Sequence, residues 1–183
     1  LLDFRRLLFK EPNGCSLYHT AQQRHELGDV LDQHIIRGAQ NSIERQDEVS
    51  LDFAIKNTDR AVGAMLSGMI AQKYGEAGLP DKTINVKFKG SAGQSFGAFL
   101  VNGVDFKLEG EANDYFAKGL SGGRVSILPP IRSNFSAEDN IIAGNTGLYG
   151  ATSGELYING KVGERFGVRN SGATYLLFLQ HTL

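Results

Sequence analysis

The sequence predicts a mainly β protein: a single-stranded parallel β-helix preceded by a helix–strand–helix segment. Three observations support this fold. Seven of the 23 glycines precede Lys89, and the other sixteen lie between Gly90 and Gly172. From Thr83 onward, short apolar triplets alternate with polar residues, which is the period of strands. A glycine–aromatic phrase also recurs about every 20 residues, a length that suits one circuit of stacked short strands.

The first half of the chain has a helical period and then a strand period. Residues 25–43, "HELGDVLDQHIIRGAQNSI", place apolar side chains at three- and four-residue steps, which gathers them on one face of a helix. These positions are Leu27, Val30, Leu31, Ile35 and Ala39. Residues 48–56, "EVSLDFAIK", alternate strictly and predict a half-buried strand. Its apolar side is Val49, Leu51, Phe53 and Ile55.

A second helix is predicted within residues 57–80, "NTDRAVGAMLSGMIAQKYGEAGLP". Thr58 or Asp59 is the expected N-cap, Gly75 can end the helix with a left-handed residue, and Pro80 prevents any extension. The expected apolar stripe is Val62, Met65, Leu66, Met69 and Ile70.

The repeat predicts three columns of stacked side chains inside the coil. Setting Gly90, Gly110 and Gly160 in register brings an aromatic residue to the same offset in each copy, and the phrase "IIAGNTGLYGATSG" joins after a slip of one residue. The expected columns are Val86, Phe106 and Leu156; Phe88, Leu108, Ile142 and Ile158; and Phe96, Phe116, Tyr149 and Phe166.

Glycine is expected at the corners of the coil, because other residues enter a positive φ at a cost of about 1 kcal/mol or more. Asn113, Asn145 and Asn170 are expected to share that conformation. The segment 126–139, "SILPPIRSNFSAED", carries paired prolines and is predicted to be a loop outside the regular spacing. An antiparallel sandwich with glycine-rich turns stays open, since strand spacing alone does not exclude it.

No catalytic, cofactor-binding or metal-binding residue is predicted. Gly119–Gly123 matches the G-x-S-x-G pattern, but a strand rather than a helix follows Ser121, and the only later histidine is His181, so Ser121 is interpreted as a turn residue. Neither the histidine spacing nor the scattered carboxylates fit a common site, and both groups are interpreted as solvated surface residues. They are His19, His25 and His34, and Asp81, Glu109, Glu111 and Asp114.

Composition narrows the partners and the compartment. The formal net charge is −1 with interspersed signs, so nucleic acid is not an expected partner, and no apolar run is long enough to predict a membrane span. The single cysteine, Cys15, cannot form an internal disulfide or hold an iron–sulfur cluster. A reducing cytoplasm is the expected location. The opening "LLDFRRLLFK" lacks a Met and a signal sequence, so we expect the chain to begin inside a longer protein.

Long phrases of the chain closely resemble the C-terminal GXGXG domain of the large subunit of glutamate synthase. They are "LYHTAQQRHELGDVLDQHII", "NTDRAVGAMLSGMIAQKYG", "GSAGQSFGAF", "LEGEANDYFAKGLSGG" and "IIAGNTGLYGATSGELYINGKVGERFGVRNSGA", between about Tyr18 and Thr174. The resemblance implies a right-handed β-helix that is a non-catalytic scaffold. It implies an oxidoreductase that makes two glutamates from glutamine and 2-oxoglutarate, with electrons from NADPH or ferredoxin.

By the same resemblance, FMN and an iron–sulfur cluster belong to other domains, and the expected partners are the upstream amidotransferase domain, the FMN-binding synthase domain and the small reductase subunit. Cys15 takes neither the role of the amidotransferase nucleophile nor that of a cluster ligand. The alternative is a separate β-helix subunit of another multisubunit oxidoreductase, similar to a formylmethanofuran dehydrogenase C-like subunit. The helix–strand–helix segment favours the first reading, because it resembles the glutamate synthase linker.

The expected organisation has three parts: an arm and linker over 1–80, the GXGXG β-helix over 81–174, and a non-family tail over 175–183. In the tail the chain reads "YLLFLQHTL" where the family continues through further coils, which we interpret as a truncation or a change of reading frame. Tyr175 to Leu179 are all apolar, so we expect the isolated chain to aggregate or to need a partner surface.

Overall fold

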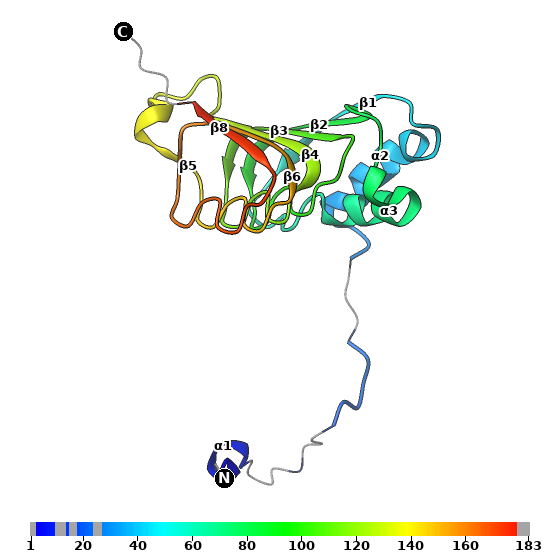
Figure 1. Ribbon diagram of the computed structural model, residues 1–183, viewed down its shortest axis with the longest axis vertical. Coiled ribbons are helices and arrows are strands. Elements are labelled where there is room, and N and C mark those ends of the chain that lie inside the picture. The colour runs from blue at the N-terminus through cyan, green and yellow to red at the C-terminus, as the bar shows by residue number, and fades with distance from the viewer. Residues whose placement is uncertain (1–2, 10–13, 15–17, 24–26, 179–183) are drawn as a thin grey trace.

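The structure, a computed structural model, describes residues 3–9, 14, 18–23 and 27–178 of the 183-residue chain (Figure 1). Its main feature is an eight-stranded sheet in which neighbouring strands pair in parallel, in the order β1-β2-β3-β4-β6-β8, with β5 beside β3 and β7 beside β5. The bounds are β1 Val49–Ile55, β2 Ile84–Ala92, β3 Val104–Ala112, β4 Ser121–Leu128, β5 Ile141–Ala143, β6 Ser153–Asn159, β7 Lys161–Val162 and β8 Thr174–Phe178. Parallel pairing rules out the antiparallel sandwich.

Two helices lie at the β1 end of the sheet, as Figure 1 shows. They are α2 (Leu31–Arg45) and α3 (Ala64–Tyr74), which continues into the short 3₁₀ helix η1 (Gly75–Ala77). Their buried apolar residues, such as Ile35 and Leu66, join the single core that runs under the strands. The remaining short helices are α1 (Arg5–Leu8), which lies apart from the sheet, and η2 (Ala137–Asp139).

Both predicted helices and the strand between them are confirmed, but the helices begin later than expected. Leu27 precedes α2 and is exposed. At α3 neither Thr58 nor Asp59 is the N-cap, because the Asp59 carboxylate accepts a hydrogen bond from Lys56 N in the preceding turn. Gly63 is the N-cap instead, and Gly75 ends the helix as predicted.

The first turn of α3 is held by Asp32 from α2. Its carboxylate accepts hydrogen bonds from the backbone amides of Gly63 at 2.6 Å and Met65 at 2.7 Å, so it satisfies amides that have no partner inside the helix. Burial raises the pKa of the Asp32 carboxyl, while the hydrogen bonds from the α3 amides act in the opposite direction. Asp32 therefore fixes α2 to the start of α3.

The sheet confirms the first predicted column and corrects the second. Phe106 lies beside Val86 on one side and Val125 on the other, and Val125 lies beside Leu156. In the second column Phe88, Leu108 and Ile158 are placed as predicted. The prediction for Ile142 is wrong, because Ile127 of β4 takes its place in the column. Ile142 belongs to β5, the strand that pairs with the end of β3 at Ala112.

The third column contains Phe96, Phe116 and Phe166, but Gly147 takes the place predicted for Tyr149. Leu148 N donates to Phe116 O and Gly167 N donates to Gly147 O, both at 2.9 Å, which fixes this register. A side chain at residue 147 would overlap the Phe116 ring. The Phe116 and Phe166 rings instead stack across the gap, with centroids 6.1 Å apart.

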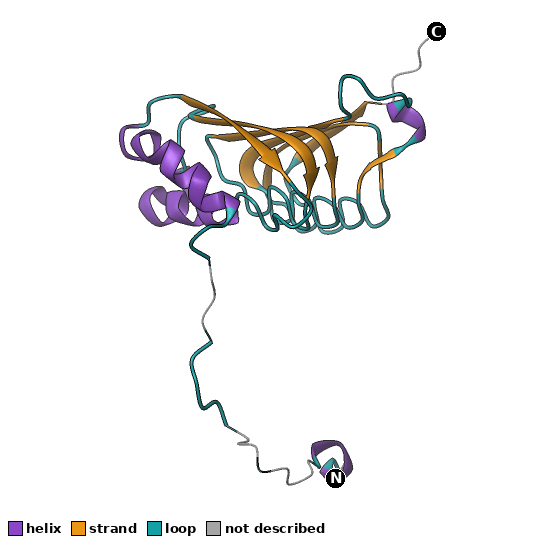
Figure 2. Cartoon of the chain, turned by 180° about the vertical axis from the view of Figure 1, so that it is seen from behind, coloured by secondary structure: helices purple, strands orange, loops and turns teal. Residues whose placement is uncertain are grey.

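The connecting turns lie in a row along one edge of the sheet (Figure 2). Every second residue has a positive φ over part of each turn, and eight of these twelve residues are not glycine. They are Ser95, Gly97 and Phe99; Tyr115, Ala117 and Gly119; Thr146, Leu148 and Gly150; and Arg165, Gly167 and Arg169. The expected cost is about 1–2 kcal/mol for each residue with a side chain, and backbone hydrogen bonds between neighbouring turns offset it.

The prediction for the asparagines is wrong, since Asn113, Asn145 and Asn170 all avoid positive φ. Their side chains accept backbone hydrogen bonds instead; Asn145 Oδ1, for example, accepts from Glu164 N in the next turn at 2.8 Å. Glycine is required where neighbouring backbones approach closely: a Cβ at Gly110 would overlap the carbonyl of Gly90. The loop predicted over 126–139 begins later than expected, because residues 126–128 belong to β4; the rest of it is confirmed between Leu128 and Ile141, with only η2 inside it.

Candidate functional site

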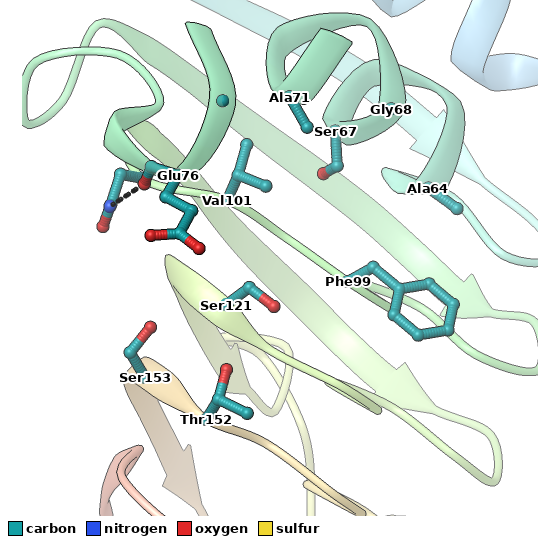
Figure 3. Close-up of a pocket in the computed structure, with 12 residues that line it drawn as sticks. Ala64, Ser67, Gly68, Ala71, Glu76, Phe99, Val101, Ser121, Thr152 and Ser153 are labelled. Carbon is teal, nitrogen blue, oxygen red and sulfur yellow. Dashed lines mark hydrogen bonds between the residues drawn. The ribbon is translucent and has the colours of Figure 1, made fainter.

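An open groove of about 930 Å³ separates α3 and η1 from the turns and strand starts of the sheet (Figure 3). One wall comes from the helix, and the other comes from three successive turns of the chain. The lining residues are Ala64, Ser67, Gly68, Ala71, Gly75, Glu76, Phe99, Val101, Asn102, Ser121, Thr152 and Ser153.

The helical wall is low because its residues are small. Ala64, Gly68, Ala71 and Gly75 follow one another at steps of four, three and four, the spacing of one helix face. A Cβ added at Gly68 would meet no atom within 4 Å. The groove is therefore open along the length of α3.

Ser67 is the polar group of this wall that has no protein partner. The residue is 2% exposed, and its Oγ makes no hydrogen bond within the part of the chain that the structure describes. Figure 3 shows this hydroxyl pointing from α3 toward the strands across the groove. A buried hydroxyl without a partner costs about 1–3 kcal/mol, so such groups in native proteins are normally satisfied by another molecule or chain.

The opposite wall carries further hydroxyl and amide groups. Ser121 is the first residue of β4 rather than the predicted turn residue, and its Oγ donates to Gly119 O at 2.8 Å. Asn102 Nδ2 donates to Glu76 O at 3.4 Å, the contact dashed in Figure 3. Glu76 is the one charged residue among those that line the groove. None of the lining residues is a histidine, lysine or cysteine that could activate Ser121.

A second polar cluster crosses the sheet. Asp105 on β3, Arg124 on β4 and Glu155 on β6 lie in one row of the register. Arg124 Nε donates to Glu155 Oε2 at 2.7 Å, and Arg124 Nη1 donates to Asp105 Oδ2 at 3.2 Å. Arg124 Nη1 also lies 3.9 Å from Asp81 Oδ1. The hydrogen bond from Arg124 lowers the pKa of the Glu155 carboxyl, and the hydrogen bond to Glu155 raises the pKa of the Tyr157 hydroxyl. The cluster joins three strands and leaves Arg124 occupied by acidic partners.

The residues considered as catalytic or metal ligands are not brought together in the part of the chain that the structure describes. His19 is exposed, and His34 Nε2 lies 3.0 Å from Asp29 Oδ1 at the surface; His25, His181 and Cys15 lie outside the described residues. Across the described ranges, no three His, Cys, Asp or Glu side chains come together as a metal site. The four carboxylates have separate partners: Asp81 with Arg124, Glu109 with Lys89, Glu111 with Ser91, and Asp114 with Asn145 N.

The residues that matter most here gave little signal in the sequence. Asp32 and Gly63 are 31 positions apart, and Ser67 appears as one polar residue on a predicted helix. Arg124 and Glu155 could have been found only by aligning β4 with β6.

Across the helices of the described segments, none has the length and apolar character needed to cross a bilayer.

Comparison with known proteins assigns the family. The family model described as "GXGXG motif" matches residues 32–178, from the start of α2 to the end of β8. The chain belongs to the GXGXG-motif family. Within this family it is similar to glutamate synthases: 52% identical over 164 residues, 90% of this chain, to "Glutamate synthase [NADH]" of Saccharomyces cerevisiae.

Two further relatives have other electron donors in their names. The chain is 44% identical over 177 residues, 96% of its length, to "Glutamate synthase [NADPH] large chain" of Bacillus subtilis, and 47% identical over 174 residues, 93% of its length, to "Ferredoxin-dependent glutamate synthase, chloroplastic" of Oryza sativa subsp. japonica. It covers 8%, 12% and 11% of the yeast, Bacillus and rice proteins. The chain thus corresponds to a GXGXG segment about a tenth as long as these relatives.

Proposed function

We propose that this chain is a non-catalytic structural domain of a glutamate synthase large subunit, packing between the amidotransferase and FMN-binding synthase domains of one polypeptide. The observation that carries the proposal is the 44–52% identity over at least nine-tenths of the chain to three proteins that are far longer. The groove chemistry also supports it, since its lining is made of small and hydroxyl side chains without an acid–base relay.

The parent reaction in this proposal joins glutamine, 2-oxoglutarate and reducing equivalents to give two glutamates. FMN and the iron–sulfur cluster belong to other domains, because a cluster needs three or four thiolates and this sequence has one cysteine. The electron donor is set outside this segment, since its relatives are named for NADH, NADPH and ferredoxin. The proposed compartment is the cytoplasm, and the small reductase subunit is a proposed further partner.

We propose the right-handed single-stranded parallel β-helix as the architecture of this scaffold. Its support is the order of parallel strands together with hydrogen bonds between the successive turns. The proposed division is the arm and linker over 1–80, the β-helix over 81–174 and the tail over 175–183. The three relatives are all glutamate synthases, which favours this function over a separate subunit of another oxidoreductase.

The test uses the complete polypeptide purified from its own gene. Glutamine-dependent glutamate formation is measured for the wild type, Ser121→Ala and Phe116→Ala. We expect wild-type turnover for Ser121→Ala, because its hydroxyl donates to Gly119 O within the chain and has no histidine, lysine or cysteine beside it in the groove lining. Phe116→Ala leaves a cavity in the core and should lower the free energy of unfolding by about 3–5 kcal/mol. Turnover should fall to the same extent as the folded fraction.

Two results would contradict the proposal. A complete polypeptide with no glutamine-dependent glutamate formation would remove the assignment to glutamate synthase. A loss of turnover in Ser121→Ala, with an unchanged thermal midpoint, would make this segment catalytic.

A further inference from the structure

We propose that the groove beside α3 is a docking site for a helix of about two turns, supplied by a part of the same polypeptide that lies outside these 183 residues. The inference rests on the proposed function, because that function places the chain in a polypeptide about ten times its length. It goes further by naming the surface and the chemistry of the segment that covers it.

The size of the groove fits a helix. A helix about 10 Å across with a pitch of 5.4 Å occupies about 420 Å³ per turn, so a space of about 930 Å³ takes about two turns. The small residues of α3, Ala64, Gly68, Ala71 and Gly75, allow a second helix axis to approach within about 8–10 Å. Larger side chains at these positions would close the groove.

Ser67 is an independent sign that something belongs there. The residue is 2% exposed, yet its hydroxyl has no partner among the described residues and points across the groove. Two turns of helix bring a polar side chain within reach, and the hydroxyl can donate to it or accept from it. The docked helix therefore carries a polar residue in the middle of its buried face.

The rest of the lining sets the character of the docked helix. Phe99 and Val101 offer apolar surface, with Phe99 about half exposed, while Ser121 and Ser153 add uncharged hydroxyls. Glu76 is the only charge in the lining and lies at the η1 end. We therefore expect an uncharged, small-to-apolar face with a Lys, Arg or amide side chain opposite Glu76.

The experiment places a photo-crosslinker in the groove of the complete polypeptide. Ala71→p-benzoylphenylalanine points the probe into the groove, and Gln72→p-benzoylphenylalanine is the matched control, since Gln72 is equally exposed on α3 but does not line the groove. After irradiation, cross-linked peptides are identified by mass spectrometry. We expect one peptide from outside the 183 residues at residue 71, in about tenfold higher yield than at residue 72, because docking raises the local concentration.

Ala71→Leu and Gln72→Leu give a second readout. In the complete polypeptide, Ala71→Leu should have a lower thermal midpoint than Gln72→Leu, because the leucine occupies the space of the docked helix. Equal yields at residues 71 and 72, or equal midpoints in the complete polypeptide, would overturn the docking site and leave the synthase assay unaffected. A cross-link to a separate protein or to a second copy would also overturn it, and the separate protein would favour the alternative function.

Discussion

Phe116 can stack on Phe166 because the residue between them in the column, Gly147, has no side chain. The same column shows that equivalent positions of the repeat can hold different residues. Three copies have a phenylalanine there, and the fourth has Gly147, which has no side chain. At this scale the fold depends on complementary volumes, with a large ring in one turn filling what the next turn leaves open.

Gly147→Ala should therefore destabilise the protein. The new methyl group would overlap the Phe116 ring, and overpacking of this kind costs about 1–3 kcal/mol. Gly28→Ala is the control, because its Cβ enters open space and should change stability by less than about 0.5 kcal/mol. Chemical denaturation of the two variants measures both changes, and a neutral Gly147→Ala would contradict the packing described for this column.

Glu155 gives a pH dependence whose sign follows from its pKa. Arg124 holds the pKa of the Glu155 carboxyl below its ordinary value of about 4.3. A lowered pKa in the folded state means that the stabilisation is present above the unfolded value and is lost as the pH falls through the folded one. The wild type should lose more stability than Glu155→Gln on acidification below about pH 4.3. Parallel curves of unfolding free energy against pH for the two proteins would show that the ion pair adds nothing.

At the scale of elements, α3 is placed by its first turn rather than by its own sequence. Its N-cap is Gly63, with a positive φ, and a side chain there would meet Leu100 and Phe106 of the sheet. The capping oxygens come from Asp32 on α2. The groove wall thus depends on a contact between two helices.

Asp32→Ala should cost about 2 kcal/mol, because it leaves the amides of Gly63 and Met65 without their acceptor. Asp47→Ala, at an exposed position after α2, should change stability by less than about 0.5 kcal/mol. Hydrogen exchange at the start of α3 provides the measurement: faster exchange of the Gly63 and Met65 amides is expected only in Asp32→Ala. Unchanged exchange at these two amides would show that the cap does not hold the helix.

At the scale of the whole molecule, the two ends of the sheet differ. The β1 end is covered by α2 and α3, whereas β8 pairs with β6 on one side and, within the described residues, has no strand on the other. Tyr175, Leu176 and Phe178 on β8 are each about half exposed. An apolar strand with an open edge is a template for association with another chain.

Leu176→Lys should therefore reduce self-association of the 183-residue chain at tens of micromolar, as measured by light scattering, because a charge on an edge strand opposes strand pairing. Ile131→Lys is the matched control, since Ile131 is 89% exposed on a loop and contributes no edge. A monodisperse wild-type monomer, or equal effects of the two lysines, would contradict the role assigned to β8.

The sequence predicted the strand register where successive strand–turn repeats have equal length and failed where the length changes. Phe96 and Phe116 are 20 residues apart and hold adjacent positions in the register as predicted, with Ala117 N donating to Phe96 O at 2.8 Å. The equivalent residues Tyr115, Thr146 and Arg165 are separated by 31 and then 19 residues, so the phase inferred for Tyr149 and Ile142 was wrong. The groove was not predictable, because Ser67 faces it only after α3 has packed against turns far along the chain.

The loop between Leu128 and Ile141 is also the place where we expect this protein to accept new sequence. Between Leu128 and Ile141 the chain leaves the stack, and the columns on either side keep their alignment, with Val125 beside Leu156 and Phe116 O bound to Leu148 N. A fluorophore, an epitope or a short affinity tag inserted into the loop between Leu128 and Ile141 would lie outside the paired strands. Because Ile131 N in this loop donates to Glu109 Oε1 of β3 at 3.3 Å, a graft that keeps this contact should leave the strands paired and report on assembly.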